Sequence, residues 1–369
     1  MLSMTNPPVI KAAPLPIAWH PDLSIYASEA FLQSVGDEYG WLGGFDAAGT
    51  LRCILPYTIV RKAMLRMARF RVETIILSGG LSVAEEKAFL NSAMGFLRST
   101  RADMVIPAAT NTLFRTYPDR AVAAPYGSYV VDLTQPEETL WNNLHSKHRN
   151  VIRNAIKKGV SICEGEAYLL PAYELIRETL KRSQLGFMSL EAFRRSLVAL
   201  GDNVKLLVAS SDGNLHGCAV IPFSRHSAYY LYGGSASSPL SGASNLLQWE
   251  AMRRFRQLGV RRYDFVGVRI NPEKGSKQDG LMLFKERFGG QLMPGYLWKC
   301  SFHPLQFFLY NLAVRLRRGG DIVDQERHKL NKTADSTAAG PAPKALDPTP
   351  KPRVLVPKNY SLPPKHLGD

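Results

Sequence analysis

The sequence predicts an α/β protein with two consecutive domains, each built on a mixed sheet flanked by helices. The chain has 369 residues, which is too long for one ordinary domain, and its hydrophobic fraction of 45% can fill two cores. Strand-like and helix-like segments alternate along most of the chain. From about residue 331 the sequence is rich in Pro, Ala, Thr and Lys, so we expect residues 331–369 to form a disordered tail.

The first domain is expected at residues 1–137. Two alternating segments separated by turn residues predict a β-hairpin. Ser82, followed by Glu85 and Glu86, predicts the start of a helix. In chain order we expect a helix at 25–35, strands at 40–45, 51–60 and 70–77, a helix at 82–98, and strands at 103–107 and 128–133.

The second domain is expected at 138–300. Pro136 before two acids predicts a helix start, and Asp212-Gly213 predicts a hairpin turn. In chain order we expect a helix at 137–158, a strand at 160–164, helices at 171–183 and 189–201, strands at 204–210, 215–222 and 228–233, a helix at 245–258, a strand at 262–268, a helix at 281–288 and a strand at 291–298. This is the element order of the GNAT acyltransferase fold. The first domain looks like a shortened version, although no residue-level repeat relates the halves.

The charge of the chain favours an anionic partner. The formal net charge is +15 and the pI is about 9.7, which suits nucleic acid, anionic lipid or a phosphorylated substrate. The four cysteines lie far apart, without metal-ligand spacing, so we expect free thiols and no metal. No apolar stretch reaches the roughly 20 residues of a transmembrane helix, and no signal peptide is recognisable. We therefore expect a cytoplasmic protein.

The helix expected at 137–158 has an apolar face and a basic face. Arg149, Arg153 and Lys157 are spaced four residues apart, and Lys147 lies nearby. Like charges at this spacing repel by a few tenths of a kcal/mol per pair, which a phosphate-bearing partner would offset. The pattern indicates either a solvated basic face or a substrate-binding site formed by these four side chains.

The segment from Tyr230 to Asn245 joins a strand to a helix N-terminus, where backbone N–H groups and the helix dipole favour an anion. Gly233 and Gly234 would let the backbone approach a cofactor closely. A coenzyme A-dependent GNAT protein usually has R/Q-x-x-G-x-G/A in this loop, whereas this chain has SSPLSGASN at 237–245. Gly233, Gly234 and Asn245 are thus candidate cofactor-binding positions, but acetyl-CoA is disfavoured. An aromatic strand end followed by a turn explains the segment equally well.

Lys285 and Asp264 are candidate catalytic residues. A lysine beside the acyl carbon would stabilise the oxyanion formed when an amine attacks an ester or thioester. Spacing alone, however, favours a surface lysine on an amphipathic helix. Asp264 would accept the proton of the amine or hydrogen-bond a neighbouring loop, and the structural role is slightly favoured. The eight histidines form no catalytic pattern, so we expect direct transfer in a ternary complex.

Four blocks of the second domain resemble the FemABX peptidyltransferases, which add amino acids to the stem peptide of lipid-linked peptidoglycan precursors. The blocks are SKHRNVIRNAIKKG, LLQWE, GVRRYDFVGV and LFKERFGG, in the order of the family. The resemblance implies two GNAT-like domains, an aminoacyl-tRNA donor and a UDP- or undecaprenyl-linked muropeptide acceptor. It implies that Phe284 and Lys285 are the Phe-Lys pair of the family, with the lysine at the transferring carbonyl. It also implies that the strand-end tyrosine is Tyr230 or Tyr232.

Two departures bear on the substrate. The coiled-coil arm of some family members is absent, and related sequences are linked to exopolysaccharide production and to acyl-CoA-dependent transfer. The resemblance therefore identifies the reaction class more closely than the substrate.

We therefore expect an acyltransferase that forms an amide on an amine of a cell-envelope precursor, without a tightly bound cofactor. Aminoacyl-tRNA is the expected donor. The alternatives are an acyl-CoA-dependent N-acyltransferase of exopolysaccharide synthesis and a non-catalytic module that binds tRNA or anionic lipid. The stretch 304–318, in an extension expected at 301–330, would either rest on the inner membrane face or pack on the domain. We expect a monomer.

Overall fold

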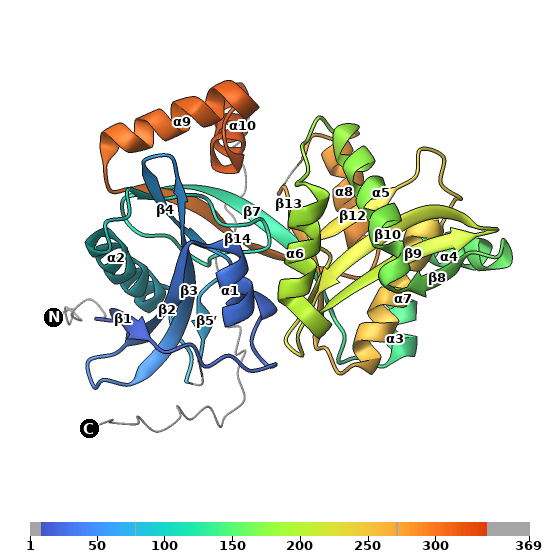
Figure 1. Ribbon diagram of the computed structural model, residues 1–369, viewed down its shortest axis with the longest axis horizontal. Helices are drawn as coiled ribbons and strands as arrows, with labels where there is room; N and C mark the ends of the chain where they lie inside the picture. Colours follow the sequence, from blue (N-terminus) through green and yellow to red (C-terminus); the bar gives the residue numbers. More distant parts are fainter. Residues whose placement is uncertain (1–8, 78, 271, 338–369) are drawn as a thin grey trace. The chain divides into compact units, whose positions relative to one another are not determined.

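The computed structural model describes residues 9–77, 79–270 and 272–337, which belong to two compact units (Figure 1). Unit 1 contains the chain up to His20, residues 26–126 and the chain from Pro294 onward, and unit 2 contains Pro21–Ile25 and Gly127–Met293. Apart from the short segment Pro21–Ile25, the chain therefore passes between the units twice, and the C-terminal helices belong to unit 1. The sequence instead predicted one boundary between residues 137 and 138 and a separate C-terminal extension.

Unit 1 is built on a sheet in which the first four long strands form a meander. Its strands lie in the order β1-β2-β3-β4-β6-β14-β7, and β5 pairs with β3. The β1-to-β4 neighbours are antiparallel, whereas β4 and β6 are parallel. The strands are β1 (Lys11–Leu15), β2 (Glu38–Phe45), β3 (Leu51–Lys62), β4 (Leu65–Phe70), β5 (Ile75–Ile76), β6 (Met104–Val105), β7 (Ala121–Asp132) and β14 (Gln291–Ser301), of which β7 and β14 also contribute residues to unit 2.

Helix α2 (Val83–Ser99) begins where the sequence predicts it, and the short helix α1 (Glu29–Val35) precedes β2. The N–H of Glu85 donates to the Ser82 hydroxyl at 3.2 Å, and the N–H of Ser82 donates to the Glu85 carboxylate at 2.7 Å. This capping box satisfies two amides that the first turn would leave unpaired. The apolar face of α2 is buried in one core with β2 and β3, which explains why the helix lies on this sheet.

The hairpin of β3 and β4 differs from the predicted strands. The strand expected at 51–60 continues to Lys62, and β4 and the short β5 replace the strand expected at 70–77. The connecting turn holds Ala63 at a φ of 53°, in the left-handed region that alanine rarely occupies. The turn therefore lacks the glycine or asparagine that would have revealed it in the sequence.

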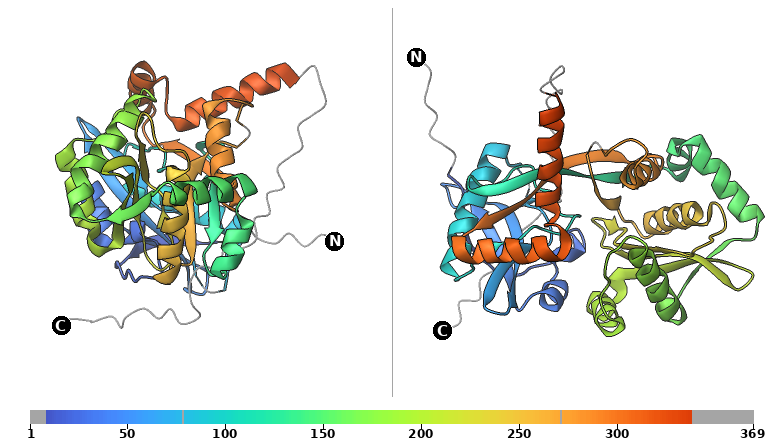
Figure 2. Two further views of the ribbon diagram at one scale, coloured as in Figure 1. Left: turned by 90° about the vertical axis from the view of Figure 1, so that its right-hand side faces the viewer. Right: turned by 90° about the horizontal axis from the view of Figure 1, so that it is seen from above.

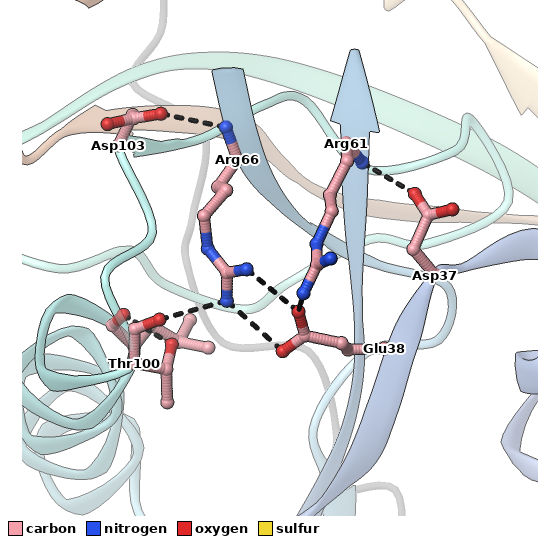
Figure 3. A network of polar contacts seen from close by, with 7 residues as sticks. Asp37, Glu38, Arg61, Arg66, Thr100 and Asp103 are labelled. Carbon is pink, nitrogen blue, oxygen red and sulfur yellow. Dashed lines mark hydrogen bonds and ion pairs between the residues drawn. The ribbon is translucent and has the colours of Figure 1, made fainter. Parts of the chain in front are cut away.

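A network of ion pairs connects this hairpin to β2 and to the chain after α2 (Figure 3). The Arg66 guanidinium donates to both carboxylate oxygens of Glu38, at 2.8 and 3.1 Å, and Arg61 pairs with the same carboxylate. Arg66 also donates to the Thr100 carbonyl at 3.1 Å, and its backbone N–H donates to Asp103 at 2.7 Å. Hydrogen bonds from Arg66 and then Arg61 lower the pKa of Glu38.

Two helices follow β14 in unit 1 and run in different directions (Figure 2). Helix α9 (Pro304–Arg318) confirms the helix expected at 304–318. Helix α10 (Ile322–Thr337) extends into the segment expected to be disordered, because its helical pattern continues past the point where the composition changes. The remainder of the predicted tail, 338–369, lies outside the described residues.

Lys299 of β14 holds both C-terminal helices. Its side chain is 2% exposed, and its ammonium donates to Asn311 of α9 at 2.8 Å, to Asp321 at 2.8 Å and to Asp324 of α10 at 2.7 Å. These acceptors use all three N–H groups of the ammonium, so the buried charge is fully satisfied.

Unit 2 has the element order that the sequence predicts for the GNAT fold. Strands β12, β10, β9 and β8 form an antiparallel sheet, and β13 lies between β7 and β11. Its remaining elements are α3 (Glu137–Asn143), α4 (Ser146–Lys157), β8 (Ser161–Glu164), α5 (Leu169–Lys181), α6 (Leu190–Leu200), β9 (Val204–Ser211), β10 (Asn214–Pro222), β11 (Ala228–Tyr229), β12 (Tyr232–Ser235), α7 (Ala243–Gln257), β13 (Arg262–Val268) and α8 (Lys277–Glu286).

Helices cover both faces of the antiparallel sheet of unit 2 (Figure 1). Leu207 and Ala209 of β9 share a core with α4 and α7, whereas Val208, between them, shares a core with α5 and α6. Alternate residues of a strand point to opposite faces, so this one strand contributes to both cores. The predicted hairpin between β9 and β10 is confirmed, with Asp212 and Gly213 at positive φ as a tight turn requires.

The helix expected at 137–158 is in fact two helices, α3 and α4. Leu144 has an extended backbone, and the His145 ring accepts a hydrogen bond from the N–H of Lys147 at 3.2 Å, which caps α4. The N–H of His145 donates to the carbonyl of Arg287 at 2.9 Å, so the break is fixed by the end of α8. Helical apolar spacing continues across the break, which is why the sequence pattern does not reveal it.

Candidate functional site

The strands of unit 2 divide between two sheets after Tyr229. The strand expected at 228–233 is two strands: β11 pairs in parallel with β13, whereas β12 pairs with β10. The N–H of Tyr230 donates to the carbonyl of Asp264 at 2.9 Å, at the point where the two sides separate. Beyond it, no described strand pairs with this edge of β13, so its backbone groups need other partners.

Strand β13 contains a β-bulge directly after Asp264. The register with β7 shifts between Asp264 and Gly267, and Val266 has a φ of 47°, which is strained for a β-branched residue. The Asp264 carboxylate accepts hydrogen bonds from the N–H of Val266 at 2.7 Å and from the Ser128 hydroxyl of β7. Asp264 therefore stabilises the bulge, whereas the catalytic role expected from the sequence stays a prediction.

Lys285 of α8 contacts the same bulge. Its ammonium donates to the carbonyl of Val266 at 2.7 Å and to the carbonyl of Gly267 at 2.8 Å. Burial lowers the pKa of Lys285 to about 8, and the negative charge of Asp264 opposes this shift. An ammonium has three N–H groups, and the described residues accept from two of them, so one remains for a ligand. Lys285 is thus not the free surface lysine that its spacing alone favours.

A run of aromatic rings connects helix α8 to the point where the strands part. The ring of Phe284 lies 5.5 Å from His148 and 5.2 Å from Phe288, measured between ring centroids. Phe288 lies 5.1 Å from Phe265, which in turn lies 6.4 Å from Tyr230. Aromatic pairs at such separations attract each other beyond their burial, so the run links α4, α8, β13 and the end of β11. Two rings of this run, Phe288 and Phe265, lie between Phe284 and Tyr230.

The two candidate tyrosines lie in different surroundings. Tyr230 packs with the core beneath α7 and belongs to the ring run. Burial raises its pKa, so the phenol stays protonated near neutral pH and is a hydrogen-bond donor. Tyr232 instead packs against Phe187, 5.1 Å away, in the core beneath α5 and α6. Tyr230 is therefore the tyrosine next to the bulge.

The three positions expected to bind a cofactor have different local surroundings. A Cβ at Gly233 would lie 1.9 Å from the phenol oxygen of Tyr230, and one at Gly234 would lie 2.7 Å from the backbone nitrogen of Ile176 in α5. Packing within unit 2 thus explains both glycines without a cofactor. Asn245 lies in the first turn of α7, the helix N-terminus that the sequence predicts there.

Helix α4 packs closely against the start of α7. A Cβ at Gly242, the N-cap of α7, would lie 2.2 Å from the carbonyl oxygen of Val151, and the φ of this glycine is 87°. Only glycine fits such a contact with this backbone. Lys147 precedes Val151 by one helical turn, and so lies on the face of α4 that approaches the α7 N-terminus.

The arginines of α4 differ in their availability to a ligand. Arg149 donates to the carbonyl of Asn142, at 2.8 Å, and to the carbonyl of Leu144, where it satisfies the end of α3. Arg149 is therefore engaged in structure, contrary to its assignment as one member of a free basic face. Arg153 is exposed and lies 5.4 Å from the ring centroid of Trp141, in a cation–π contact.

Lys147 and Lys157 are also exposed. The charge that α4 offers to an anion thus comes from Lys147, Arg153 and Lys157. These three side chains do not form one row, because Lys147 lies on the α7 side of the helix.

Sequence reasoning did not single out His148. It is 5% exposed, and no described residue hydrogen-bonds its Nδ1. Burial and the charge of Arg287 lower its pKa to about 4, so the ring is neutral at pH 7. The available signal was its helical spacing from the apolar residues Ile152 and Ala155.

Neither a cluster of possible metal ligands nor a disulfide occurs among the described residues. In the described part of the chain, no three His, Cys, Asp or Glu side chains are grouped so that they could hold a metal. All four cysteines are free, and burial raises the pKa of Cys53, Cys218 and Cys300. These three thiols therefore stay protonated near neutral pH.

Residues 146–276 match the family model of an acetyltransferase (GNAT) domain. The chain is 31% identical over 118 residues to the lipid II:glycine glycyltransferase of Staphylococcus haemolyticus. The aligned segment covers 31% of this chain and 28% of that protein. It is 33% identical over 92 residues to the enzyme of the same name from Staphylococcus epidermidis, covering 25% and 22%. These matched segments of the chain are similar to the corresponding segments of the two glycyltransferases.

A crystal structure of FemX confirms the predicted fold. It matches with a TM-score of 0.59 at 14% identity, over 76% of this chain and 93% of that one. The chain thus has a fold of two GNAT-like domains in tandem. The segments matched in sequence span less than a third of the length of the glycyltransferases. The GNAT model, moreover, ends at residue 276, so it includes the bulge of β13 but neither Phe284 nor Lys285.

Among the residues that the structure describes, no helix combines the length and apolar character needed to cross a membrane.

Proposed function

We propose that this protein transfers an aminoacyl or acyl group to an amine of a cell-envelope precursor, with aminoacyl-tRNA as the donor. The observation behind the proposal is the ammonium of Lys285, which two carbonyls of the β13 bulge hold in place while one N–H stays available. The relatives named lipid II:glycine glycyltransferases support a lipid-linked acceptor and an aminoacyl donor.

The reaction benefits from a fixed hydrogen-bond donor beside the acyl carbonyl, and a positively charged donor is stronger than a neutral one. The amine nitrogen attacks the carbonyl carbon of the ester, and the carbonyl oxygen gains negative charge in the tetrahedral intermediate. The free N–H of Lys285 would donate to that oxygen, and removal of one such donor typically costs about 2.7–4 kcal/mol of barrier. Its position is preorganised because two of its N–H groups are already bound. As the intermediate collapses, a C–N bond replaces the ester C–O bond.

A proton must leave the attacking amine. Asp264 is close to the bulge, but its carboxylate already accepts from Val266 and Ser128. We therefore assign the proton to the leaving oxygen of the donor, and give Asp264 the role of a positioning residue for the bulge and hence for Lys285. Phe284 and Tyr230 would line the substrate side of the bulge.

Phosphates of the donor or of the carrier would contact the exposed cations of α4. Lys147, Arg153 and Lys157 are available for this contact, whereas Arg149 is engaged at the end of α3. Lys147 lies on the side of α4 that faces the start of α7, where backbone N–H groups and the helix dipole would also favour an anion.

An acyl-CoA-dependent N-acyltransferase of exopolysaccharide synthesis is the second candidate. The match of residues 146–276 to an acetyltransferase domain favours it. The loop before α7 opposes it, because it lacks the usual glycine motif and its Gly242 is pressed against Val151.

A non-catalytic module that binds tRNA or anionic lipid is the third candidate, and it predicts different mutant behaviour. If Lys285→Met retained all cellular function while Arg153→Ala/Lys157→Ala abolished it, the binding module would be the correct description. Arg149→Ala is unsuitable for this comparison, because it removes a contact that α3 needs.

The direct test supplies the purified chain with lipid-linked or UDP-linked muropeptide and either aminoacylated tRNA or acyl-CoA. We expect mass spectrometry to detect a new amide with the tRNA ester and none with the thioester. An amide formed only with acyl-CoA would establish the second candidate. Cells without the protein should show altered cell-wall precursors, and unchanged peptidoglycan and exopolysaccharide precursors would contradict both enzymatic proposals.

A further inference from the structure

Helix α9 exposes a continuous row of large apolar side chains, which we call the α9 stripe. Five residues, spaced three or four apart, make up the stripe, and on a helix they fall within an arc of about 100°. They are Leu305, Phe308, Leu309, Leu312 and Leu316, with exposed fractions of 67%, 61%, 52%, 42% and 79%. No described residue of α9 is fully buried, so this helix does not owe its apolar residues to a core.

The opposite face of α9 is the one attached to unit 1. Asn311 on that face accepts a hydrogen bond from the buried ammonium of Lys299 at 2.8 Å, and Phe307 lies 5.6 Å from the same ammonium. Tyr310 is half-buried there, and burial raises its pKa to about 12. Because Lys299 holds α9 by this inner face, the stripe on the outer face stays directed away from the unit. Figure 2 shows α9 as a separate helix along the edge of unit 1.

The charged side chains of α9 are all positive. Arg315, Arg317 and Arg318 lie in the last turn of α9, and the helix contains no acidic residue. The nearest acids in sequence, Asp321 and Asp324, are bound to Lys299. A helix with Leu and Phe on one side and flanking arginines has the composition of helices that lie flat in the interface of a bilayer.

We propose that the α9 stripe docks unit 1 on an anionic lipid surface. The five apolar side chains would enter the boundary between headgroups and acyl chains, and the three arginines would contact lipid phosphates. A second copy of this chain fits less well, because two facing stripes would bring six arginines together without any carboxylate of α9 to pair with them. This inference concerns α9 of unit 1 and does not depend on the proposed reaction of Lys285.

The test is flotation of the full chain with vesicles of phosphatidylcholine, with and without phosphatidylglycerol. We expect the chain to float with the vesicles that contain phosphatidylglycerol. Phe308→Glu/Leu312→Glu should lower the partition coefficient by about tenfold for each side chain, since each buries roughly a full apolar group. Arg315→Gln/Arg317→Gln/Arg318→Gln should remove most of the dependence on phosphatidylglycerol.

Met64→Glu is the matched control, because Met64 is also in unit 1 and is 95% exposed on the β3–β4 turn. It should leave flotation unchanged, and circular dichroism should show that all variants are folded. Equal flotation of wild type and Phe308→Glu/Leu312→Glu would overturn the proposal and assign any binding to other basic segments, such as the lysines of 338–369. If wild type binds neither kind of vesicle, the proposal is wrong. If the double variant changes only the oligomeric state in sedimentation, the stripe is a protein interface and the proposal is also wrong.

Discussion

Lys285→Met removes the ammonium from the β13 bulge, and its effects on stability and on activity should separate. The carbonyls of Val266 and Gly267 lose their partner, which costs about 1–3 kcal/mol each where they stay dry. In the other direction, the shift of the lysine pKa from 10.5 to about 8 corresponds to roughly 3 kcal/mol of unfavourable charge burial at neutral pH. The two contributions largely cancel, so we expect the free energy of unfolding in urea to change by less than about 3 kcal/mol.

The activity should fall far more than the stability. Loss of one oxyanion donor lowers kcat by about 10²–10³-fold, with little change in KM. The assay is steady-state transfer from aminoacylated tRNA to muropeptide, read by mass spectrometry. Lys277→Met is the control on the same helix, because Lys277 is exposed and its ammonium donates a hydrogen bond to the Ser183 hydroxyl. A Lys285→Met protein that is folded and retains more than about a third of wild-type kcat would refute the role given to this ammonium.

The pH dependence supplies a second check of the same role. If the charged form of Lys285 is required, transfer should decline as pH rises through about 8. Lys285→Arg stays charged in this range, so the ratio of its rate to that of wild type should increase with pH. Stability should change in the opposite direction. Above about pH 8 the unfolded chain still binds a proton that the native lysine has released. The free energy of unfolding should therefore rise as the pH increases toward 10.5. A constant rate ratio between pH 7 and about 9 would contradict the assignment.

Three further predictions concern the fold. Gly234→Ala should destabilise the fold by about 1–3 kcal/mol, because the new Cβ would lie 2.7 Å from the α5 backbone. Gly95→Ala in helix α2 should stabilise it by up to about 1 kcal/mol, because the new Cβ would have no atom within 4 Å. The urea midpoints of both variants test this. His148 has a lowered pKa, so the free energy of unfolding of wild type should fall by about 2 kcal/mol between pH 7 and 5 as the unfolded chain takes up a proton. Thermal melts at both pH values should show that His148→Leu lacks this fall. Lys299→Met leaves two carboxylates near the core without their cation and should cost about 3 kcal/mol or more, while Lys87→Met breaks only an exposed pair and should cost less than about 1 kcal/mol. Equal unfolding curves for the two lysine variants would contradict the role given to the buried ammonium.

Element type and order followed from the sequence because apolar periodicity and turn residues are local signals. The α2 capping box and the turn at Asp212-Gly213 are read from adjacent residues, and both are present in the structure. The break at Leu144 was missed because its cause is a distant contact, between the N–H of His145 and the end of α8. The division of the chain into units was also non-local, since β7 and β14 each contribute to both.

The candidate site shows the same division between local and distant causes. The resemblance to FemABX pointed to Lys285, but spacing alone described it as a surface lysine. What sets its environment is the bulge at Val266, and a positive φ at valine has no signal in the sequence. Arg149 is the converse case. Its spacing suggested a free cation, yet the helix break created by other contacts supplies it with two carbonyl acceptors.

The geometry of the bulge also explains why a lysine, rather than an arginine, suits position 285. Two carbonyls 2.7 and 2.8 Å from one nitrogen converge on a single point, and an ammonium can bond both while a third N–H points elsewhere. A planar guanidinium spreads its donors over three nitrogens and would need the carbonyls farther apart. Strain at Val266 makes those carbonyls converge, and Asp264 maintains that strain through the N–H of the same residue. Asp264→Ala removes the oxygen that accepts from Val266 and Ser128, so it should weaken transfer through the position of Lys285. The loss should appear in kcat and not in KM, although Asp264 itself never touches the substrate.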